Sequence, residues 1–186
     1  MAAGVDLSSL TAYAGSADAE TPLPVDAWNP PDCGDIDIRI ARDGVWFHDG
    51  APIQRSTLVR LFARLLRRDG ERYVLVTPVE KLSIVVEDLP FLAVEMTQDD
   101  QGLRFRTNVG DQMRAGTDHP LHFDLDDGFR PSVHVRGGLW ARLSRPLALD
   151  LAGLTEVRLH QGEDWLGVIS DGVFFPIAPA ALQTDF

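Results

Sequence analysis

The chain contains one lysine, Lys81, among 17 basic residues, and all the others are arginines. Lysine carries a compact ammonium group, whereas arginine carries a planar guanidinium with a fixed fork of donors. A single lysine in such a chain therefore indicates a position where a compact charge is needed. It could bind a phosphate group as a point charge, or it could pair with Glu80 or Glu87. The alternative is a surface lysine without a specific role.

Lys81 ends the stretch TPVEK (77–81), which follows a run of strand-forming residues. Pro78 fixes its own φ and stiffens the exit from that strand. A strand end followed by a turn can present the side chains of Thr77, Glu80 and Lys81 together. In the alternative interpretation the turn is structural, and its polar side chains satisfy the local backbone.

A similar stretch follows thirty residues later. When residues 77–90 are aligned with residues 107–120 without a gap, four positions carry the same residue in both stretches. In this second copy, Arg106, Thr107 and Asn108 occupy the place that matches the first turn. If a twofold axis relates the two copies, their turns could face one groove and bind one small ligand. The repeated stretch therefore supplies a candidate binding site.

Two further residues, His119 and Arg136, are weaker candidates for binding an anion. Arginine can contact an anion through two hydrogen bonds at once. Arg136 fits the solvent-facing side of a strand equally well. The candidate ligand-binding residues are therefore Thr77, Glu80, Lys81, Arg106, Thr107, Asn108, His119 and Arg136.

Sequence motifs for common cofactors and reactions are absent. There is no GxxxxGK[ST] loop, no GxGxxG stretch that opens a helix and no GxSxG stretch. The five histidines are scattered, and neither an HExxH motif nor a cysteine pair accompanies them. We therefore predict no metal site, and the cofactor and any catalytic residue stay unknown.

The composition is that of a soluble globular protein, with 45% hydrophobic and 24% charged residues. No apolar run reaches the roughly 18 residues that a membrane-spanning helix requires. The start of the chain lacks the basic and apolar regions of a signal peptide, and Cys33 is the single cysteine. These features predict a cytoplasmic protein without a membrane span.

The net charge of −11 argues against a nucleic-acid partner. Binding to nucleic acid requires a positive surface that replaces the counterions of the phosphates. A negative overall charge mainly favours solubility, and it leaves room for a local basic pocket that binds a small anion.

Hydrophobic periodicity predicts few helices and many strands. Alternating residues around an Asp-Gly pair predict a β-hairpin over residues 35–48, because both turn positions favour positive φ. An apolar stripe over residues 58–66 predicts a helix whose last turns include Arg67 and Arg68. A short helix is expected within residues 145–154, and most of the remaining chain resembles strands. This pattern predicts an α+β fold with mostly antiparallel sheets.

The sequence also indicates an internal duplication. Besides the repeated turn, the stretch IARDGVWF (40–47) recurs as VISDGVFF (168–175). We therefore predict two related β-rich halves, an N-terminal α+β domain over residues 34–92 and a C-terminal β-rich domain over residues 93–186. Residues 1–33 are predicted to form a leader that packs on the first half.

The stretches LFARLL (61–66), LVTPVEK (75–81) and VEDLPF (86–91) resemble those of an uncharacterised proteobacterial family, domain-of-unknown-function family twelve-eighty-five. The resemblance extends over about residues 22–177. It implies a duplicated α+β core whose C-terminal half is loosely similar to a pleckstrin-homology-like barrel. It also implies a ligand site between the halves, for a nucleotide-like molecule, and a role in signalling.

Three functions fit these observations. The first is a non-enzymatic ligand-binding or signalling module that binds a nucleotide-like anion at the interface of the two halves. The second is an adaptor that binds a protein partner through its pleckstrin-homology-like half or an exposed sheet edge. The third is a hydrolase or transferase with Glu80 or Asp88 as base and Lys81 or Arg106 as anion clamp, which the missing catalytic motifs disfavour. We expect the first, because the repeated turns carry basic and hydroxyl side chains.

Overall fold

The structure is a computed structural model that describes residues 10–11 and 22–181 of the chain. It divides into two compact units that separate after Pro90, and residues 137–139 group with the first unit. Most of the predicted leader, residues 1–33, lies outside the described residues. Among the helices of the described part, none is long and apolar enough to cross a membrane.

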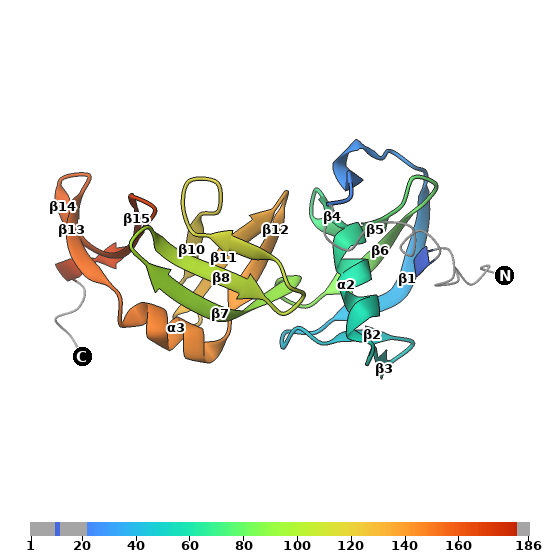
Figure 1. Cartoon of the computed structure of the whole chain (residues 1–186), viewed down its shortest axis with the longest axis horizontal. Helices are drawn as coiled ribbons and strands as arrows, with labels where there is room; N and C mark the ends of the chain where they lie inside the picture. Colours follow the sequence, from blue (N-terminus) through green and yellow to red (C-terminus); the bar gives the residue numbers. More distant parts are fainter. Residues whose placement is uncertain (1–9, 12–21, 182–186) are drawn as a thin grey trace. The chain divides into compact units, whose positions relative to one another are not determined.

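The first unit is built on a six-stranded sheet with the strand order β3-β2-β1-β6-β5-β4 (Figure 1). Its neighbouring strands are antiparallel, except that the two central strands, β1 and β6, are parallel. The elements of this unit are η1 (Val25–Ala27), β1 (Asp32–Ile40), β2 (Trp46–His48), β3 (Ala51–Pro52), α2 (Ser56–Leu65), β4 (Leu66–Asp69), β5 (Arg72–Val76) and β6 (Lys81–Val86).

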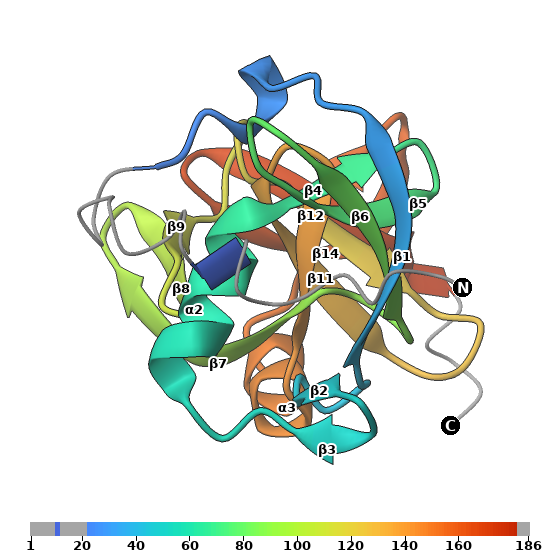
Figure 2. The ribbon, with the colours of Figure 1, turned by 90° about the vertical axis from the view of Figure 1, so that its right-hand side faces the viewer.

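Helix α2 runs beside this sheet in both views (Figures 1 and 2) and contacts β5. Phe62 on the helix is fully buried, and its ring lies 6.4 Å from the buried ring of Trp46 on β2. The β1–β2 hairpin pairs Ile38 with His48, which confirms the hairpin predicted around the Asp-Gly turn. The apolar stripe of the helix and the apolar side of the strands therefore share one core.

Helix α2 ends earlier than its apolar stripe predicts. The residue after the helix, Leu66, has an extended backbone with φ −73° and ψ 132°. It begins β4, which pairs with β5 across Gly70, and the φ of 62° at Gly70 suits a tight turn. Arg67 and Arg68 consequently lie on a strand and not in the last helical turns. Leu66 fits the apolar spacing of the helix, but its pairing with β5 holds it in a strand.

The second unit contains another six-stranded sheet, with the order β10-β11-β12-β7-β8-β9, and a three-stranded sheet, β13-β14-β15. The larger sheet curls into a half-barrel, and α3 contacts β7 (Figure 1). The elements are β7 (Phe91–Asp99), β8 (Gly102–Thr107), β9 (Gln112–Arg114), β10 (Leu121–Asp124), β11 (Arg130–Arg136), β12 (Leu139–Leu143), α3 (Arg145–Ala152), β13 (Glu156–His160), β14 (Glu163–Ser170) and β15 (Val173–Pro179). The short helix predicted within residues 145–154 is thus confirmed.

The two six-stranded sheets have the same topology. In each, three consecutive strands run from the centre of the sheet to one edge, and the next three return from the other edge to the centre. The first and the sixth strand then pair in parallel, as β1 with β6 and as β7 with β12. The prediction of two related β-rich halves is therefore confirmed, with β1–β6 equivalent to β7–β12.

The sequence repeats that suggested the duplication do not mark its equivalent positions. The turn over residues 77–80 joins the fifth and sixth strands of its sheet, whereas the turn over residues 108–111 joins the second and third strands of the other. Residues 40–47 belong to the β1–β2 hairpin, and residues 168–175 to the β14–β15 hairpin outside the repeat. The matches reflect similar turn chemistry and not equivalent places in the two halves.

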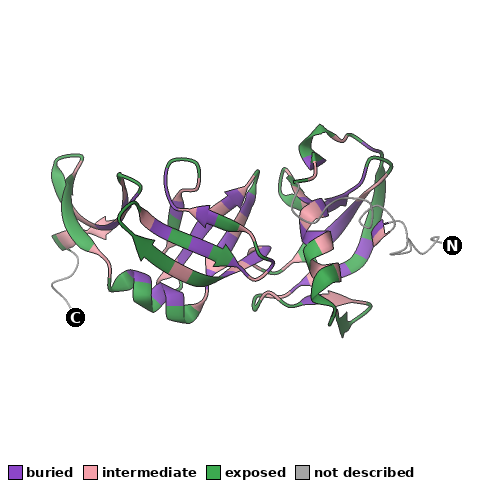
Figure 3. Ribbon diagram, viewed as in Figure 1, coloured by how far each residue is buried: buried purple, intermediate pink, exposed green. Residues whose placement is uncertain are grey.

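In both units, buried and exposed residues alternate along strands such as β1 and β8 (Figure 3). The outer faces of these strands can therefore carry polar side chains.

The three-stranded sheet is attached to the half-barrel through Ser170, which is buried. Its hydroxyl donates a hydrogen bond to the carbonyl of Ala115 at 2.6 Å and accepts one from the N–H of Leu103 at 2.8 Å. One buried hydroxyl therefore links β14 to two segments of the half-barrel.

Candidate functional site

Lys81 begins β6 in the first unit, and its side chain is 16% exposed. Its Nζ lies 2.9 Å from a carboxylate oxygen of Asp69. The same carboxylate accepts two hydrogen bonds from Arg67, at 2.6 and 3.0 Å. Lys81 is therefore paired across the sheet with an aspartate on β4, and not with either of the glutamates that sequence proximity suggested.

Arg67 extends this ion-pair network to the segment before the sheet. Its guanidinium donates to the backbone carbonyls of Val25 and Trp28, at 2.7 and 2.8 Å. The two cations lower the pKa of Asp69 to about 2, with the larger contribution from Arg67. Since the fork of Arg67 already engages both carboxylate oxygens, a compact ammonium fits the remaining space. The network accounts for the retained lysine without a ligand.

Thr77 is buried and uses its hydroxyl within its own turn. The hydroxyl oxygen accepts hydrogen bonds from the N–H groups of Val79 and Glu80, at 3.4 and 3.2 Å. This geometry matches the structural interpretation of the turn. In the part of the chain that the structure describes, one carboxylate oxygen of Glu80 is buried without a hydrogen-bond partner. A buried polar atom without a hydrogen bond lowers the stability of the folded state. The structural interpretation of this turn therefore explains Thr77 but does not explain the carboxylate of Glu80.

The second turn is also occupied with the fold. The hydroxyl of Thr107 accepts from the N–H of Asp111 at 3.0 Å. Asn108 binds the backbone of Leu92 twice, through its N–H at 2.8 Å and its side-chain oxygen at 3.1 Å. Arg136 donates to the carboxylate of Asp111 at 2.8 Å. The structure thus brings three predicted residues, Thr107, Asn108 and Arg136, to one end of the curled sheet, where they hold its strands together.

His119 belongs to another group of side chains. Its Nδ1 lies 3.1 Å from the backbone carbonyl of His134, and the two rings are 5.8 Å apart. The ring of His134 in turn lies 5.2 Å from that of Trp140. His119 therefore belongs to an aromatic cluster beside β11 and β12. The expectation that the turns at residues 77–81 and 107–111 share one groove stays a prediction.

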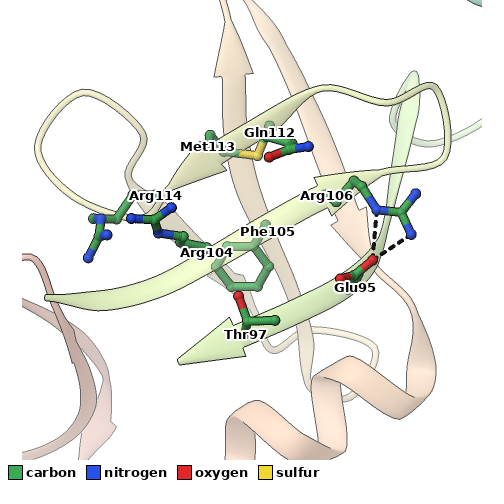
Figure 4. A pocket seen from close by; sticks show the side chains of 8 residues that line it. All are labelled: Glu95, Thr97, Arg104, Phe105, Arg106, Gln112, Met113 and Arg114. Carbon is green, nitrogen blue, oxygen red and sulfur yellow. Dashed lines mark hydrogen bonds and ion pairs between the residues drawn. The ribbon is translucent and has the colours of Figure 1, made fainter. Parts of the chain in front are cut away.

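Arg106 lies on a surface that the sequence did not single out, the outer face of β7, β8 and β9 (Figure 4). Cross-strand pairing sets two rows of polar side chains beside each other, Glu95–Arg106–Gln112 and Thr97–Arg104–Arg114. They lie over a hollow of about 450 Å³, which we name the arginine hollow. It is lined by Glu95, Thr97, Arg104, Phe105, Arg106, Gln112, Met113 and Arg114.

Two carboxylates hold the three arginines of the hollow in place. Asp99 accepts two hydrogen bonds from Arg114, at 2.7 and 2.9 Å, and lies 3.0 Å from Nε of Arg104. The hydrogen bond from Arg114 is the largest of the effects that lower the pKa of Asp99 to about 2. The third guanidinium, that of Arg106, donates to Glu95 at 2.7 Å. The donors are therefore oriented before any ligand arrives.

The charges of the arginine hollow suit an anion. Three arginines against the carboxylates of Glu95 and Asp99 leave one excess positive charge, in a chain whose net charge is −11. The side chains of Arg104 and Arg106 are 58% and 46% exposed, so their guanidinium groups face solvent. Guanidinium groups bind carboxylate and phosphate through parallel hydrogen bonds. The hollow is therefore a candidate anion site.

Within the described ranges there is no group of three metal-ligating side chains.

Only Arg106 of the hollow was among the candidates from the sequence. The strand LRFRT (103–107) alternates strictly, and this signal places Arg104 on the same face as Arg106. Arg114 could not be found in this way, because its position depends on the pairing of β8 with β9. The alternation within one strand does not show in which register the next strand of the hairpin pairs with it.

Two family descriptions match the chain. The N-terminal domain of DUF1285, a domain of unknown function, matches residues 23–89, and the C-terminal domain, from a protein of unknown function, matches residues 90–177. No curated protein matches the chain.

Two solved structures are similar to the whole chain or to a large part of it. A DUF1285 family protein from Silicibacter pomeroyi DSS-3 is 44% identical, with a TM-score of 0.83, over 93% of this chain and 96% of that chain. A DUF1285 family protein from Shewanella baltica OS155 is 26% identical, with a TM-score of 0.53, over 62% of this chain and 90% of that chain.

Proposed function

This chain belongs to the DUF1285 family, whose domains are described as being of unknown function, and we propose that it is a non-enzymatic module that binds a small, nucleotide-like anion. The observation that carries the proposal is the arginine hollow, where three oriented guanidinium groups share one concave surface. The ligand class follows from the donors, because guanidinium forks match the oxygens of phosphate and carboxylate groups.

The polar side chains between the arginines extend the match to a larger ligand. Thr97 offers a hydroxyl and Gln112 an amide, both on the same outer face as Arg104 and Arg106. A hydroxyl and an amide can each donate and accept hydrogen bonds, as the sugar and base of a nucleotide require. A volume of about 450 Å³ lies in the range of small-molecule sites. We therefore favour a phosphorylated metabolite over inorganic phosphate.

The catalytic alternative has weaker support. It assigns the role of base to Glu80 and that of anion clamp to Lys81, but the side chain of Lys81 is only 16% exposed and its ammonium is engaged with Asp69 at 2.9 Å. The paired guanidinium groups of Arg104 and Arg106, in contrast, face solvent. Of the two carboxylates at the arginine hollow, Glu95 lines it and accepts a hydrogen bond from Arg106, and Asp99 is engaged with Arg104 and Arg114. A binding role is therefore the simpler proposal. We place the protein in the cytoplasm, where phosphorylated metabolites are available. Its role there is in signalling, in which a protein partner recognises the ligand-bound form.

A thermal-shift screen tests the proposal. Mono-, di- and cyclic nucleotides and inorganic phosphate are added to the wild type and to R104A and R106A. A ligand at about 100 times its Kd stabilises the folded state by about 2.7 kcal/mol, which corresponds to roughly 5–10 °C in Tm for a chain of this size. In each variant we expect Kd to rise roughly tenfold to a hundredfold, since a hydrogen bond to a charged group contributes about 1.5–3 kcal/mol.

The matched control is R60A, because Arg60 is exposed on α2 in the first unit and its loss changes the net charge equally. Binding in R60A should equal that of the wild type. The proposal is wrong if no compound in the panel shifts Tm, or if R60A weakens binding as much as R104A and R106A do.

The adaptor function remains a second candidate because of one observation. The strand β13 is the edge of its sheet, and Val157 and Leu159 on it are 51% and 75% exposed. Exposed apolar residues on an edge strand are typical of a surface that pairs with another strand.

A further inference from the structure

Strand β13 pairs with β14 on one side and forms the edge of the three-stranded sheet on the other. Every residue of this strand is exposed except His160, which is half-buried. An edge strand leaves a row of backbone donors and acceptors available to a further strand. The β13 edge, defined as residues 155–160, is therefore a template for strand addition.

The side chains of the β13 edge separate by chemistry. Val157 and Leu159 share one face, because side chains alternate along a strand. Glu156 and Arg158 lie on the opposite face, and the Nε of Arg158 is 3.0 Å from the carboxylate of Glu156. Charged side chains and proline on an edge strand hinder its pairing with another strand. The two charges of this strand are opposite in sign, so in a second copy each can meet its complement.

We propose that β13 pairs antiparallel with β13 of a second copy of this chain, with the two Val157 residues opposite each other. In this register Glu156 of each copy lies opposite Arg158 of the other, so two opposite-charge pairs form on one face. On the other face the two valines are flanked by Leu159 of each copy. The two three-stranded sheets become one six-stranded sheet across a twofold axis.

The charge pattern selects this register from the alternatives. When the twofold axis is perpendicular to the sheet, residues that lie opposite each other have their side chains on the same face. The axis therefore passes beside one residue of β13, which lies opposite the same residue of the second copy; we call this residue the centre. A centre at Glu156 sets two glutamates opposite each other, and a centre at Arg158 sets two arginines opposite each other. Like charges in direct opposition destabilise a strand pair. A centre at Leu159 also avoids like charges, but it sets Arg158 opposite His160 and forms no carboxylate–arginine pair. The centre at Val157 avoids like charges and gains two attractive pairs.

The interface is small, so the dimer is weak and depends on concentration. One short strand from each copy buries less surface than the roughly 1,200 Å² typical of stable complexes. We therefore expect a monomer–dimer equilibrium in the micromolar range or weaker, measured by sedimentation velocity on the full chain over a range of concentrations.

Charge reversal tests the register. The single variants E156R and R158E each turn both attractive pairs into like-charge pairs, and we expect dimerisation to weaken at least about tenfold. The double variant E156R/R158E restores opposite charges and should dimerise as the wild type does. An equimolar mixture of E156R and R158E should form a mixed dimer, because each position then faces its opposite charge.

Two controls separate this effect from a loss of folding or a general charge effect. Circular dichroism must be unchanged in the single variants, and R60E, which reverses an exposed charge on α2, should leave the equilibrium as it is in the wild type. A wild type that is monomeric at all concentrations overturns the proposal and leaves the β13 edge to a different protein. A dimer that persists in both single variants, or a mixture that forms no mixed dimer, also overturns it.

Discussion

The replacement of Asp69 by alanine is expected to destabilise the first unit by about 3 kcal/mol. Asp69 is shared by Arg67 and Lys81, and the three side chains are only 13–23% exposed. Without the carboxylate, two partly buried cations lose their counter-charge and face each other. Urea denaturation followed by tryptophan fluorescence measures the change, since Trp28 and Trp46 lie in this unit.

The control for this variant is D32A. Asp32 forms an ion pair with Arg72 at 3.0 Å, but its side chain is 39% exposed and that of Arg72 56%. An exposed pair contributes at most about 1 kcal/mol, so D32A should be much less destabilising. Equal effects of the two substitutions would contradict the importance of the network around Lys81.

The same network has a defined pH dependence. The pKa of Asp69 is lowered from 3.8 to about 2 in the folded state. A lowered pKa means that the stabilisation is present above the unfolded pKa and is lost as the pH falls through the folded pKa. The difference in stability between the wild type and D69A should therefore be constant above about pH 5 and shrink between about pH 4 and 2. A difference that does not change over this range would argue against an ionised Asp69 as its source.

The substitution G102A should destabilise the second unit by at least about 3 kcal/mol. A Cβ at Gly102 would lie 2.4 Å from the hydroxyl of Ser170 and 2.6 Å from the backbone nitrogen of Asp171. These atoms belong to the contact that attaches the three-stranded sheet to β8, so the backbone would have to shift. The φ of 135° at Gly102 adds strain for any residue with a side chain. Chemical denaturation of the variant measures the loss.

Gly128 supplies the control, because its φ of 82° is also positive but a Cβ at this position would meet no described atom within 4 Å. G128A therefore reports the backbone strain alone, about 1–2 kcal/mol. If G102A is no more destabilising than G128A, the close contact with Ser170 does not contribute to the attachment of the sheet.

The fold was predictable where local signals agree with long-range pairing. The hairpin around the Asp-Gly pair and the short helix before β13 follow directly from the sequence. The end of α2 was wrong by the length of β4, because Leu66 continues the apolar period of the helix but pairs with Leu75 in the sheet. The duplication was right, but the repeats that indicated it align turns that have different places in the two sheets.

The candidate site was less predictable than the fold. The hydroxyls of Thr77 and Thr107 are used inside their own turns, as the structural interpretation had allowed. The partner of Lys81 is Asp69, 12 residues away and two strands across the sheet. The arginine hollow draws its side chains from three strands, and only pairing between the strands brings them together. These strands are consecutive and joined by short turns, but the register of their pairing, which decides which side chains meet, is not set by the sequence pattern.

The most direct test of anion binding is an NMR titration that follows the side-chain Nε–Hε signals of the arginines, assigned with single variants. Pyrophosphate and a nucleoside triphosphate serve as probes. We predict that the signals of Arg104, Arg106 and Arg114 shift together and saturate, while that of Arg60 stays in place. Shifts confined to residues outside the arginine hollow, or shifts that grow linearly for every exposed arginine, would contradict the proposed function.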